Sequence, residues 1–274
     1  MERPIEKAIG TPVEELDTPA LIVDLSRLDQ NLQTVHSFFE GSSAKLRPYV
    51  GTHRTPDLAH RQLALGGTVG GVAVGTVGQA EVFIDSGIDD VMITTEVVMP
   101  SKIARVCNLA RQAIVTVPVD NLSNVDDLSE SAIASNVNLK VVVDVHTGLN
   151  GCGVEPGKPA VDLAKYVCKA KGLEFVGFYS YEGANVGKNE VLRSQSRKWI
   201  QMILDTREEA EKAGLEIQTV VVGGTHNYDI AAGIDGVTEI PAGTYALLDE
   251  RYREQRPELQ PAASVIATVS SVPE

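Results

Sequence analysis

The chain has 274 residues, of which 43% are hydrophobic and 22% are charged, so it can bury one large core or two ordinary ones, and a disordered chain is excluded. Its net charge of −13, with no basic stripe, argues against nucleic acid as a partner, because phosphate binding needs clustered lysine and arginine. The first residues lack the apolar segment of a signal peptide, and no apolar run approaches the roughly 18 residues of a membrane helix, so we expect a cytoplasmic protein with no membrane partner.

Short β-branched runs alternate with amphipathic segments along the chain. Strands are predicted at 20–24, 46–50, 69–74, 90–94, 113–117, 139–145, 173–180, 219–224 and 237–243. Helices are predicted between most of them, at 26–40, 55–66, 76–87, 100–112 and 192–214. Ser26 and Thr55 are predicted to begin helices, with Pro56 at a first helical position, and Gly87 and Gly214 are predicted to end them.

This alternation, repeated about eight times, predicts an α/β fold of the (β/α)8 TIM-barrel type, in which reactive groups lie at the carboxyl ends of the strands. A doubly wound sheet is the alternative, but no GxGxxG sequence follows the first strand. We expect residues 1–15 to form an amino-terminal arm and residues 16–258 the barrel. A further strand predicted at 263–271 has no following partner, so residues 259–274 are expected to begin a β-domain that is largely absent. An exposed strand of this kind favours association, and a homodimer is therefore kept as a hypothesis.

The three cysteines are widely spaced. No CxxC pair and no HExxH sequence is present, so the sequence holds no local zinc signature and no metal site is predicted. Cys107 and Cys168 fall in helical segments, where we expect reduced thiols buried in the core.

Two turns rich in small residues follow the last two predicted strands of the barrel. The segments 220–233 and 240–245 contain Gly223, Gly224, Thr225, Gly243, Thr244 and Tyr245. Glycine allows a ligand to approach the backbone closely, and two converging turns at the last strands are typical of the phosphate site of such barrels. The alternative is a pair of tight turns that simply require glycine, and we favour phosphate binding.

Other candidates lie at predicted strand ends. Tyr181 is placed to hydrogen-bond the ring of a ligand and Glu182 to act as an acid or base, although a structural role at a strand end is equally consistent. His146 and Asn150 lie in the glycine-rich segment 143–157, which is also readable as a long turn.

Among the histidines, His53 and His226 lie at predicted strand ends and are the better candidates for proton transfer, whereas His36 and His60 lie in helices and are expected to be structural. The stretch LRPYVGTHRTP (46–56) places Arg47, Tyr49, Gly51 and His53 on one face of a predicted strand. That face is polar and chemically capable, but Gly51 interrupts it.

Six stretches together resemble the D-threonine aldolase/D-serine dehydratase group, relatives of the alanine racemase amino-terminal barrel. They are LDTPALIVDLSRLDQNL (16–32), LRPYVGTHRTPDLA (46–59), TVGQAEVFIDSGIDDVMIT (76–94), VVVDVHTGLNGCGVEPG (141–157), GLEFVGFYSYEGA (172–184) and GGTHNYDIAAGIDGVTEIPAGTY (223–245). The resemblance implies a barrel that binds pyridoxal 5′-phosphate (PLP), followed by a β-domain. It also implies aldol cleavage or dehydration of D-3-hydroxy amino acids.

The chain departs from the family pattern at two positions. The family reads R-P-H-x-K-T-H-K where this chain reads RPYVGTHR, so the resemblance places Gly51 at the lysine that forms the Schiff base with PLP. Gly151 likewise stands where the family has an arginine facing the phenolic oxygen of the cofactor. Lys45 precedes the strand and is no obvious substitute.

The resemblance implies a complete set of site residues. The catalytic positions are Gly51, His53 and Tyr181, and Tyr181 is expected near the pyridine ring. The cofactor-binding positions are Arg47, Tyr49, Gly151, Gly223, Gly224, Thr225, Gly243, Thr244 and Tyr245. PLP would be bound non-covalently if at all, and the resemblance places the metal ligands of the family in the carboxyl-terminal domain that we expect to be largely absent.

Three functional hypotheses follow. The first is a family member that binds PLP but is impaired in lyase activity or lacks it, because lysine supplies both the covalent attachment and the proton-transfer base. The second is a non-catalytic or fragmentary product that binds PLP or another phosphorylated small molecule. The third is an enzyme with changed chemistry in the same barrel, using His53, Tyr49 or Tyr181 as acid–base groups.

Overall fold

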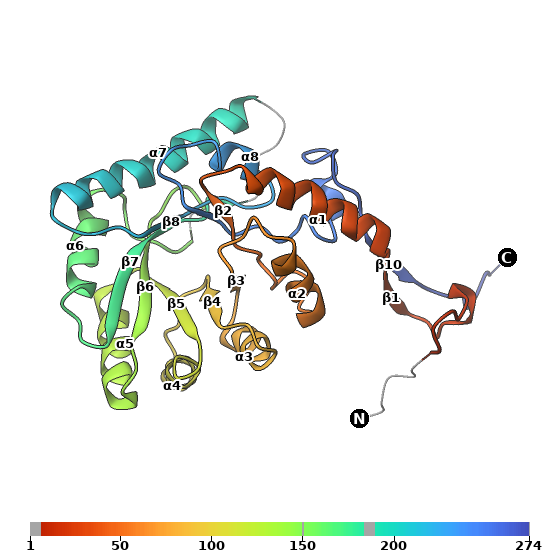
Figure 1. Cartoon of the computed structure of the whole chain (residues 1–274), viewed down its shortest axis with the longest axis horizontal. Helices are drawn as coiled ribbons and strands as arrows, with labels where there is room; N and C mark the ends of the chain where they lie inside the picture. The colour runs from red at the N-terminus through yellow and green to blue at the C-terminus, as the bar shows by residue number, and fades with distance from the viewer. Residues whose placement is uncertain (1–6, 150, 184–189, 274) are drawn as a thin grey trace.

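A computed structural model describes residues 7–149, 151–183 and 190–273. Eight parallel strands form one sheet in the spatial order β2-β9-β8-β7-β6-β5-β4-β3 (Figure 1). Their bounds are β2 (Lys45–Leu46), β3 (Val72–Val74), β4 (Asp90–Ile93), β5 (Ile114–Val119), β6 (Leu139–Asp144), β7 (Leu173–Tyr179), β8 (Thr219–Val221) and β9 (Glu239–Ile240). The predicted parallel (β/α)8 architecture is therefore confirmed.

The sheet closes on itself between its first and last strands. Single bridges join Leu46 to Thr68 and Tyr49 to Ala73, and the amide of Val50 donates to the carbonyl of Ala73 over 2.9 Å. The strand predicted at 46–50 is regular only at Lys45–Leu46, because Pro48 has no amide to donate and the ladder continues as separate bonds.

Residues along each strand alternate between two cores. In β6, Val141 and Val143 pack outward against the helices, whereas Val142 packs into the barrel interior. The interior cluster comprises Ala73, Met92, Val142, Val176, Tyr179 and Val221, with Tyr49 and Tyr181 packed on it. The same alternation turns Asp144, at the carboxyl end of β6, toward the barrel axis.

Helices surround the sheet, and the long α7 is prominent in Figure 1. They are α1 (Leu25–Glu40), α2 (Pro56–Ala64), α3 (Val77–Asp85), α4 (Pro100–Leu109), α5 (Leu122–Ser135), α6 (Lys158–Val167), α7 (Glu190–Lys212) and α8 (Tyr228–Ala231). The prediction that Ser26 begins α1 was wrong, because Asp24 is the cap and its carboxylate accepts from the amides of Ser26 and Arg27. Thr55 and Pro56 stand at the start of α2 as predicted.

The first strand, β1 (Ala20–Val23), lies outside the barrel and pairs antiparallel with β10 (Ala263–Ile266), beyond α1 in Figure 1. The strand predicted at 263–271 is therefore shorter than expected, and its partner is a strand that precedes it in the chain. Of the predicted arm, residues 1–6 lie outside the described residues, and Val13–Glu15 form a single 3-10 turn.

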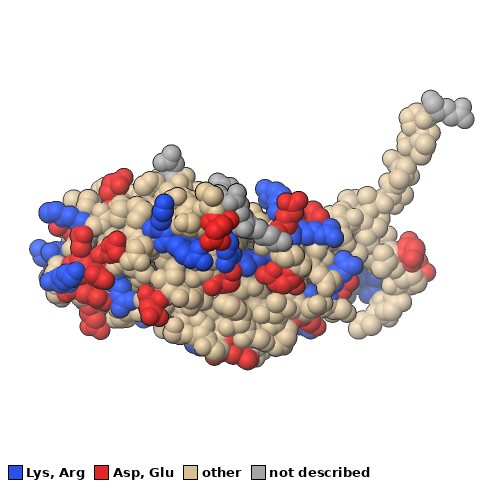
Figure 2. All heavy atoms as spheres, turned by 90° about the horizontal axis from the view of Figure 1, so that it is seen from above, with Lys and Arg blue, Asp and Glu red and all other residues tan. Residues whose placement is uncertain are grey.

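The expectation of a buried Cys168 was also wrong. Cys107 is buried in α4, but Cys168 directly follows α6 and is exposed. No helix among the described residues is long and apolar enough to cross a membrane. On the face shown in Figure 2, lysine and arginine side chains are interspersed with aspartate and glutamate rather than gathered in a stripe.

Candidate active site

One cavity of about 390 Å³ opens at the carboxyl ends of the barrel strands. It is lined by Tyr49, Thr52, Thr94, Thr95, Glu96, Asp144, Val145, His146, Thr147, Leu149, Gly151, Cys152, Tyr179, Tyr181, Gly224, Thr225, His226, Pro241, Gly243, Thr244 and Tyr252. Neither a lysine nor an arginine of the described residues lines it. Its volume falls in the roughly 300–1,000 Å³ range of small-molecule sites.

The two turns rich in small residues meet at one wall of this cavity. Gly224, Thr225, Gly243 and Thr244 line it, and the hydroxyl of Thr225 joins the turns by accepting from the amide of Tyr245 over 3.1 Å. Gly243 has to be glycine, because a Cβ there would lie 2.1 Å from the carbonyl oxygen of Tyr49. The amides of Thr225 and Thr244 have no acceptor among the described residues. This wall therefore offers unpaired N–H groups to an anion.

A buried polar network supports the first of the two turns, which contains Gly224 and Thr225. Asn227 accepts from the amide of Gly224 over 2.9 Å and donates to Glu182, and its side-chain amide donates to Ser196 over 2.7 Å. Arg256 donates to the carbonyl oxygens of Thr225, at 2.8 Å, and His226, at 2.7 Å. The turn is thus fixed before any ligand arrives.

His226 and Tyr181 form the neighbouring part of the cavity wall. The Nε2 atom of His226 lies 3.3 Å from the Oε1 atom of Glu182, and both side chains are buried. The ring of Tyr181 packs edge-on against that of His226, with centroids 5.9 Å apart. Burial raises the pKa of Tyr181 well above its usual range, so its hydroxyl is a donor at neutral pH.

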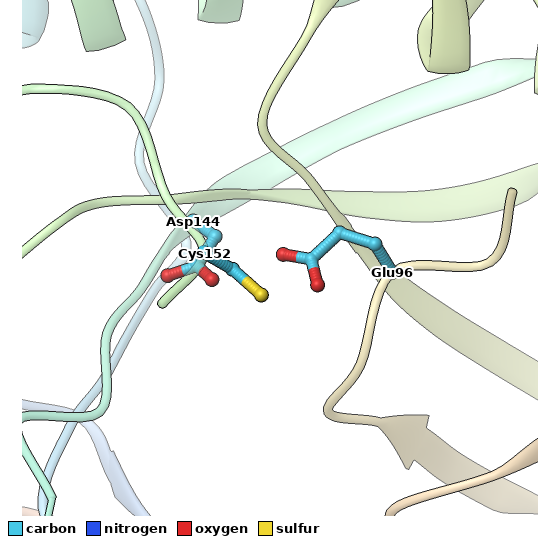
Figure 3. Close-up of side chains that lie close together, drawn as sticks. All are labelled: Glu96, Asp144 and Cys152. Atoms are coloured by element: carbon cyan, nitrogen blue, oxygen red, sulfur yellow. The ribbon is translucent and has the colours of Figure 1, made fainter. Parts of the chain in front are cut away.

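Three ionisable groups face one another in the cavity: Glu96 after β4, Asp144 at the end of β6 and Cys152 in the following loop (Figure 3). Their ligand atoms all lie within 4.8 Å of one another. Burial and the neighbouring Glu96 raise the pKa of Asp144 well above its usual range. A hydrogen bond to Glu96, burial and the nearby carboxylates raise the pKa of Cys152 to about 12. Sequence reasoning missed this cluster.

Position 51 is covered by the ring of Tyr49. A Cβ at Gly51 would lie 3.0 Å from two ring carbons of Tyr49 and 3.1 Å from Oε1 of Gln79. The hydroxyl of Tyr49 reaches on to Gly75, where a Cβ would lie 2.7 Å away. The interruption of the polar face at Gly51 is thus filled by its neighbour on that face.

Several predicted site residues lie apart from this cavity. Arg47 points into the barrel but at its opposite end, where it pairs with Glu239 at 2.6 Å and Asp90 at 2.8 Å and lines a second cavity. His53 does not line the main cavity; its Nε2 atom lies 3.0 Å from Gln62, and burial lowers its pKa.

Tyr245 is also placed in the core. Its hydroxyl accepts from Gln62 over 2.8 Å and lies 2.9 Å from Nε2 of His36. Because Nδ1 of His36 faces the carbonyl oxygen of Gly66 at 2.8 Å and must donate there, Nε2 is the acceptor for Tyr245. His60, on α2, contacts the carbonyl oxygen of Ser86 and takes no part in the cavity.

The remaining candidates lie at or beside the cavity. Gly151 lines it, and a Cβ there would make only ordinary contacts with Leu149. His146 lines it too. Gly223 lies behind the turn, where Asn227 takes the space of a Cβ. Asn150 lies outside the described residues.

A closed (β/α)8 barrel with a polar cavity at the carboxyl ends of its strands defines the class of protein, in which small molecules bind at that face. The chain belongs to the alanine racemase N-terminal domain family, which matches residues 23–245.

Individual proteins of known activity or structure are also similar to this chain. The chain is 31% identical over 272 residues to a D-threonine aldolase of an Arthrobacter species, covering 96% of this chain and 71% of the relative. It is 32% identical over 246 residues to a 3-hydroxy-D-aspartate aldolase of Paracoccus denitrificans strain Pd 1222, covering 89% of this chain and 63% of that protein. The crystal structure of D-threonine aldolase from Filomicrobium marinum superposes with a TM-score of 0.89 at 34% identity, over 95% of this chain and 72% of that one.

Proposed function

We propose that this chain is a PLP-binding member of the D-threonine aldolase/D-serine dehydratase group that is impaired in lyase activity or lacks it. The observation that carries the proposal is the composition of the cavity wall. It combines a ready anion site at Gly224, Thr225, Gly243 and Thr244 with the absence of any lysine among the described lining residues. The substrate class, D-3-hydroxy amino acids, is carried over from the relatives.

The residues of the cavity suit binding of the phosphate group of PLP, but they do not suit covalent attachment of PLP to the chain. Two turns offer unpaired N–H groups, and Arg256 lies behind them with its guanidinium on the carbonyls of Thr225 and His226. Tyr181 supplies a ring and a hydroxyl beside this site. When bound, PLP supplies an electron sink for the amino acid carbon. Gly51 offers no amine to anchor it, and Tyr49 occupies the adjoining space.

Charge in the cavity favours weak binding. Glu96 lines it beside Asp144, whose raised pKa favours the neutral carboxyl, and no basic side chain of the described residues lines the cavity. A doubly charged phosphate therefore depends on backbone N–H groups alone, without the charge-assisted bonds that arginine or lysine would add. We expect PLP to be held reversibly and to be lost on dialysis.

Binding is tested by titrating the full chain with PLP while following its thermal unfolding. A ligand that binds only the folded state raises the free energy of unfolding by RT ln(1 + [L]/Kd), or about 2.7 kcal/mol at 100 times Kd. Borohydride followed by mass spectrometry should find no PLP covalently fixed in the barrel. A stoichiometric adduct on a barrel lysine, or no stabilisation at millimolar PLP, would overturn the proposal.

The site is located with a matched pair of variants. Gly151→Trp should fill the cavity, since a Cβ at Gly151 meets only Leu149 at 3.8 Å and so causes no backbone strain. Gly41→Trp places the same side chain on an exposed position with nothing within 4 Å. PLP should stabilise the Gly41 variant as it does the original chain, and should leave the Gly151 variant unchanged.

Changed chemistry in the same barrel is the second candidate, and one observation favours it. His226 lines the cavity and contacts buried Glu182, which is the arrangement that orients a general base. Exchange of the α-proton of D-threonine in D2O, followed by NMR with PLP present, tests it. Exchange should be lost in His226→Asn, and absence of exchange in the original chain removes this candidate.

A further inference from the structure

We propose that Glu96, Asp144 and Cys152 form a binding site for one divalent transition-metal cation of the Zn²⁺ class. The proposal does not rest on the proposed function, because it uses only the positions of these three side chains and not any contact with PLP. In Figure 3 the carboxylate of Glu96 faces the sulfur of Cys152, and the carboxylate of Asp144 lies beside Cys152.

The donor set suits such a cation. Zn²⁺ binds thiolate sulfur at about 2.3 Å and carboxylate oxygen at about 2.0–2.2 Å, usually as a tetrahedron, which places ligand atoms about 3.3–3.7 Å apart. The three donor atoms already lie within 4.8 Å of one another. Side-chain rotations that move these donor atoms by about 1–1.5 Å would bring all three within bonding distance of one cation. Soft sulfur beside hard oxygen favours Zn²⁺ over Mg²⁺ or Ca²⁺.

One buried polar atom at this place lacks a hydrogen-bond partner, and no basic group of the described residues offsets the two acids. The Oε1 atom of Glu96 is inaccessible to solvent and has no hydrogen-bond partner among the described residues. Only 7% of the surface of Asp144 is exposed, and although it is hydrogen-bonded to Glu96 and to the backbone of Val145, it forms no ion pair within the described chain. Two acids that share a buried place without a positive charge are costly to ionise, and a cation at the centre of the cluster would offset both of them and give Oε1 of Glu96 a partner.

The surroundings add negative potential and leave access. Asp120 lies close enough to act on Asp144 and Cys152, and it accepts from the amide of Gly153 over 3.3 Å. Cys152 is exposed, so the site opens toward the cavity. A three-ligand site of this kind leaves a fourth position for water or for an oxygen of a bound small molecule.

The test uses Co²⁺ as a spectroscopic substitute for Zn²⁺ on the full chain, stripped with a chelator and kept free of PLP. We expect one Co²⁺ per chain and a thiolate charge-transfer band in the near ultraviolet that Zn²⁺ abolishes by displacement. Cys152→Ser should lose the band and weaken Zn²⁺ binding by more than the 10- to 100-fold typical of a lost outer-shell partner. Cys168→Ser is the matched control, because Cys168 is also exposed but lies outside the cavity, and it should bind as the original chain does.

Asp144→Asn provides a second arm that leaves every sulfur in place and should weaken binding without removing the remaining band. Circular dichroism verifies that each variant is folded. Three results would overturn the proposal: no saturable binding by the original chain, equal Zn²⁺ affinity in Cys152→Ser, or loss of the band in Cys168→Ser. Failure of PLP to bind would leave these measurements unaffected, so the two proposals are tested separately.

Discussion

A lysine at position 51 would have to enter space that Tyr49 and Gln79 fill. The Cβ alone would lie 3.0 Å from the Tyr49 ring and 3.1 Å from the Gln79 oxygen, before the four further atoms of a lysine side chain are placed. Forcing extra atoms into a packed region costs about 1–3 kcal/mol. At about 2–4 °C per kcal/mol, Gly51→Lys should lower Tm by about 2–12 °C.

The obstacle is Tyr49, so a second substitution should remove it. Tyr49→His, which the resemblance to the family suggests, replaces the phenol that covers positions 51 and 75 with a shorter ring. In the double variant Tyr49→His/Gly51→Lys we expect a favourable coupling of about 0.5–3 kcal/mol between the two positions. Thermal and urea unfolding of the original chain, both single variants and the double variant measures it, with Gly41→Lys as an exposed control.

The same four proteins test the anchor itself. After incubation with PLP and borohydride, the double variant should carry a stable label on residue 51, the Gly51→Lys variant less, and the others none at that position. Glycine release from D-threonine reports any recovered aldol cleavage. Equal stability and equal labelling of the Gly51→Lys and double variants would refute the role given to Tyr49. An unlabelled double variant would refute position 51 as the anchor.

Other variants separate stability from binding. Arg47→Met leaves Asp90 and Glu239 unpaired at the far end of the barrel and should cost about 3–5 kcal/mol in urea unfolding, with PLP affinity unchanged in the folded protein; altered affinity would contradict its placement. Asn227→Ala removes the hydrogen-bond partner of the Gly224 amide and one partner of the buried Glu182 carboxylate, so it should lower the free energy of unfolding by about 1–3 kcal/mol or more. It should also weaken PLP binding. A loss of stability with unchanged PLP affinity would show that the network does not support the binding site. Burial lowers the pKa of His36 below its ordinary 6.5 in the folded protein, so the unfolded chain binds a proton first and the free energy of unfolding falls as the pH drops below 6.5. His36→Gln should therefore flatten this part of the plot of Tm against pH. An unchanged slope in this variant would contradict the role given to His36.

The alternation of the sequence was sufficient to predict the barrel, because outward residues such as Val141 and Val143 and inward residues such as Val142 follow the period of a strand. It could not show that the first strand leaves the barrel. Strand β1 has the composition of any other strand, and its pairing with β10 depends on contacts between distant parts of the chain.

Arg47 illustrates a different limit. The sequence placed it on the same face as Tyr49, and both do point into the barrel. Two residues along a strand correspond to about 6.6 Å along the barrel, which moves the side chain of Arg47 away from the main cavity and toward the second cavity at the opposite end. Periodicity therefore predicts on which face of a strand a side chain lies, but not how far along the barrel axis it lies.

The acidic cluster gave no local signal. Glu96, Asp144 and Cys152 come from different loops and strand ends, and only closure of the barrel brings them together. The inward direction of Asp144 follows from the same alternation as Val142, so one member was accessible to sequence reasoning. The network of Asn227, Glu182 and Ser196 likewise joins separate elements, with Ser196 contributed by α7.

The pairing of β1 with β10 has a consequence for biosynthesis. Strand β1 precedes the eight strands of the barrel in the chain, whereas β10, its only described strand partner, follows all of them, so β1 leaves the ribosome before every barrel strand and β10 only after them. Until β10 has been synthesised, β1 presents an unpaired edge with Leu21 exposed, the kind of surface that nascent chains on neighbouring ribosomes can capture. The ladder of β1 and β10 lies outside the eight-stranded sheet, so β10 adds no strand to the barrel and instead covers the edge of a strand that was synthesised before the barrel.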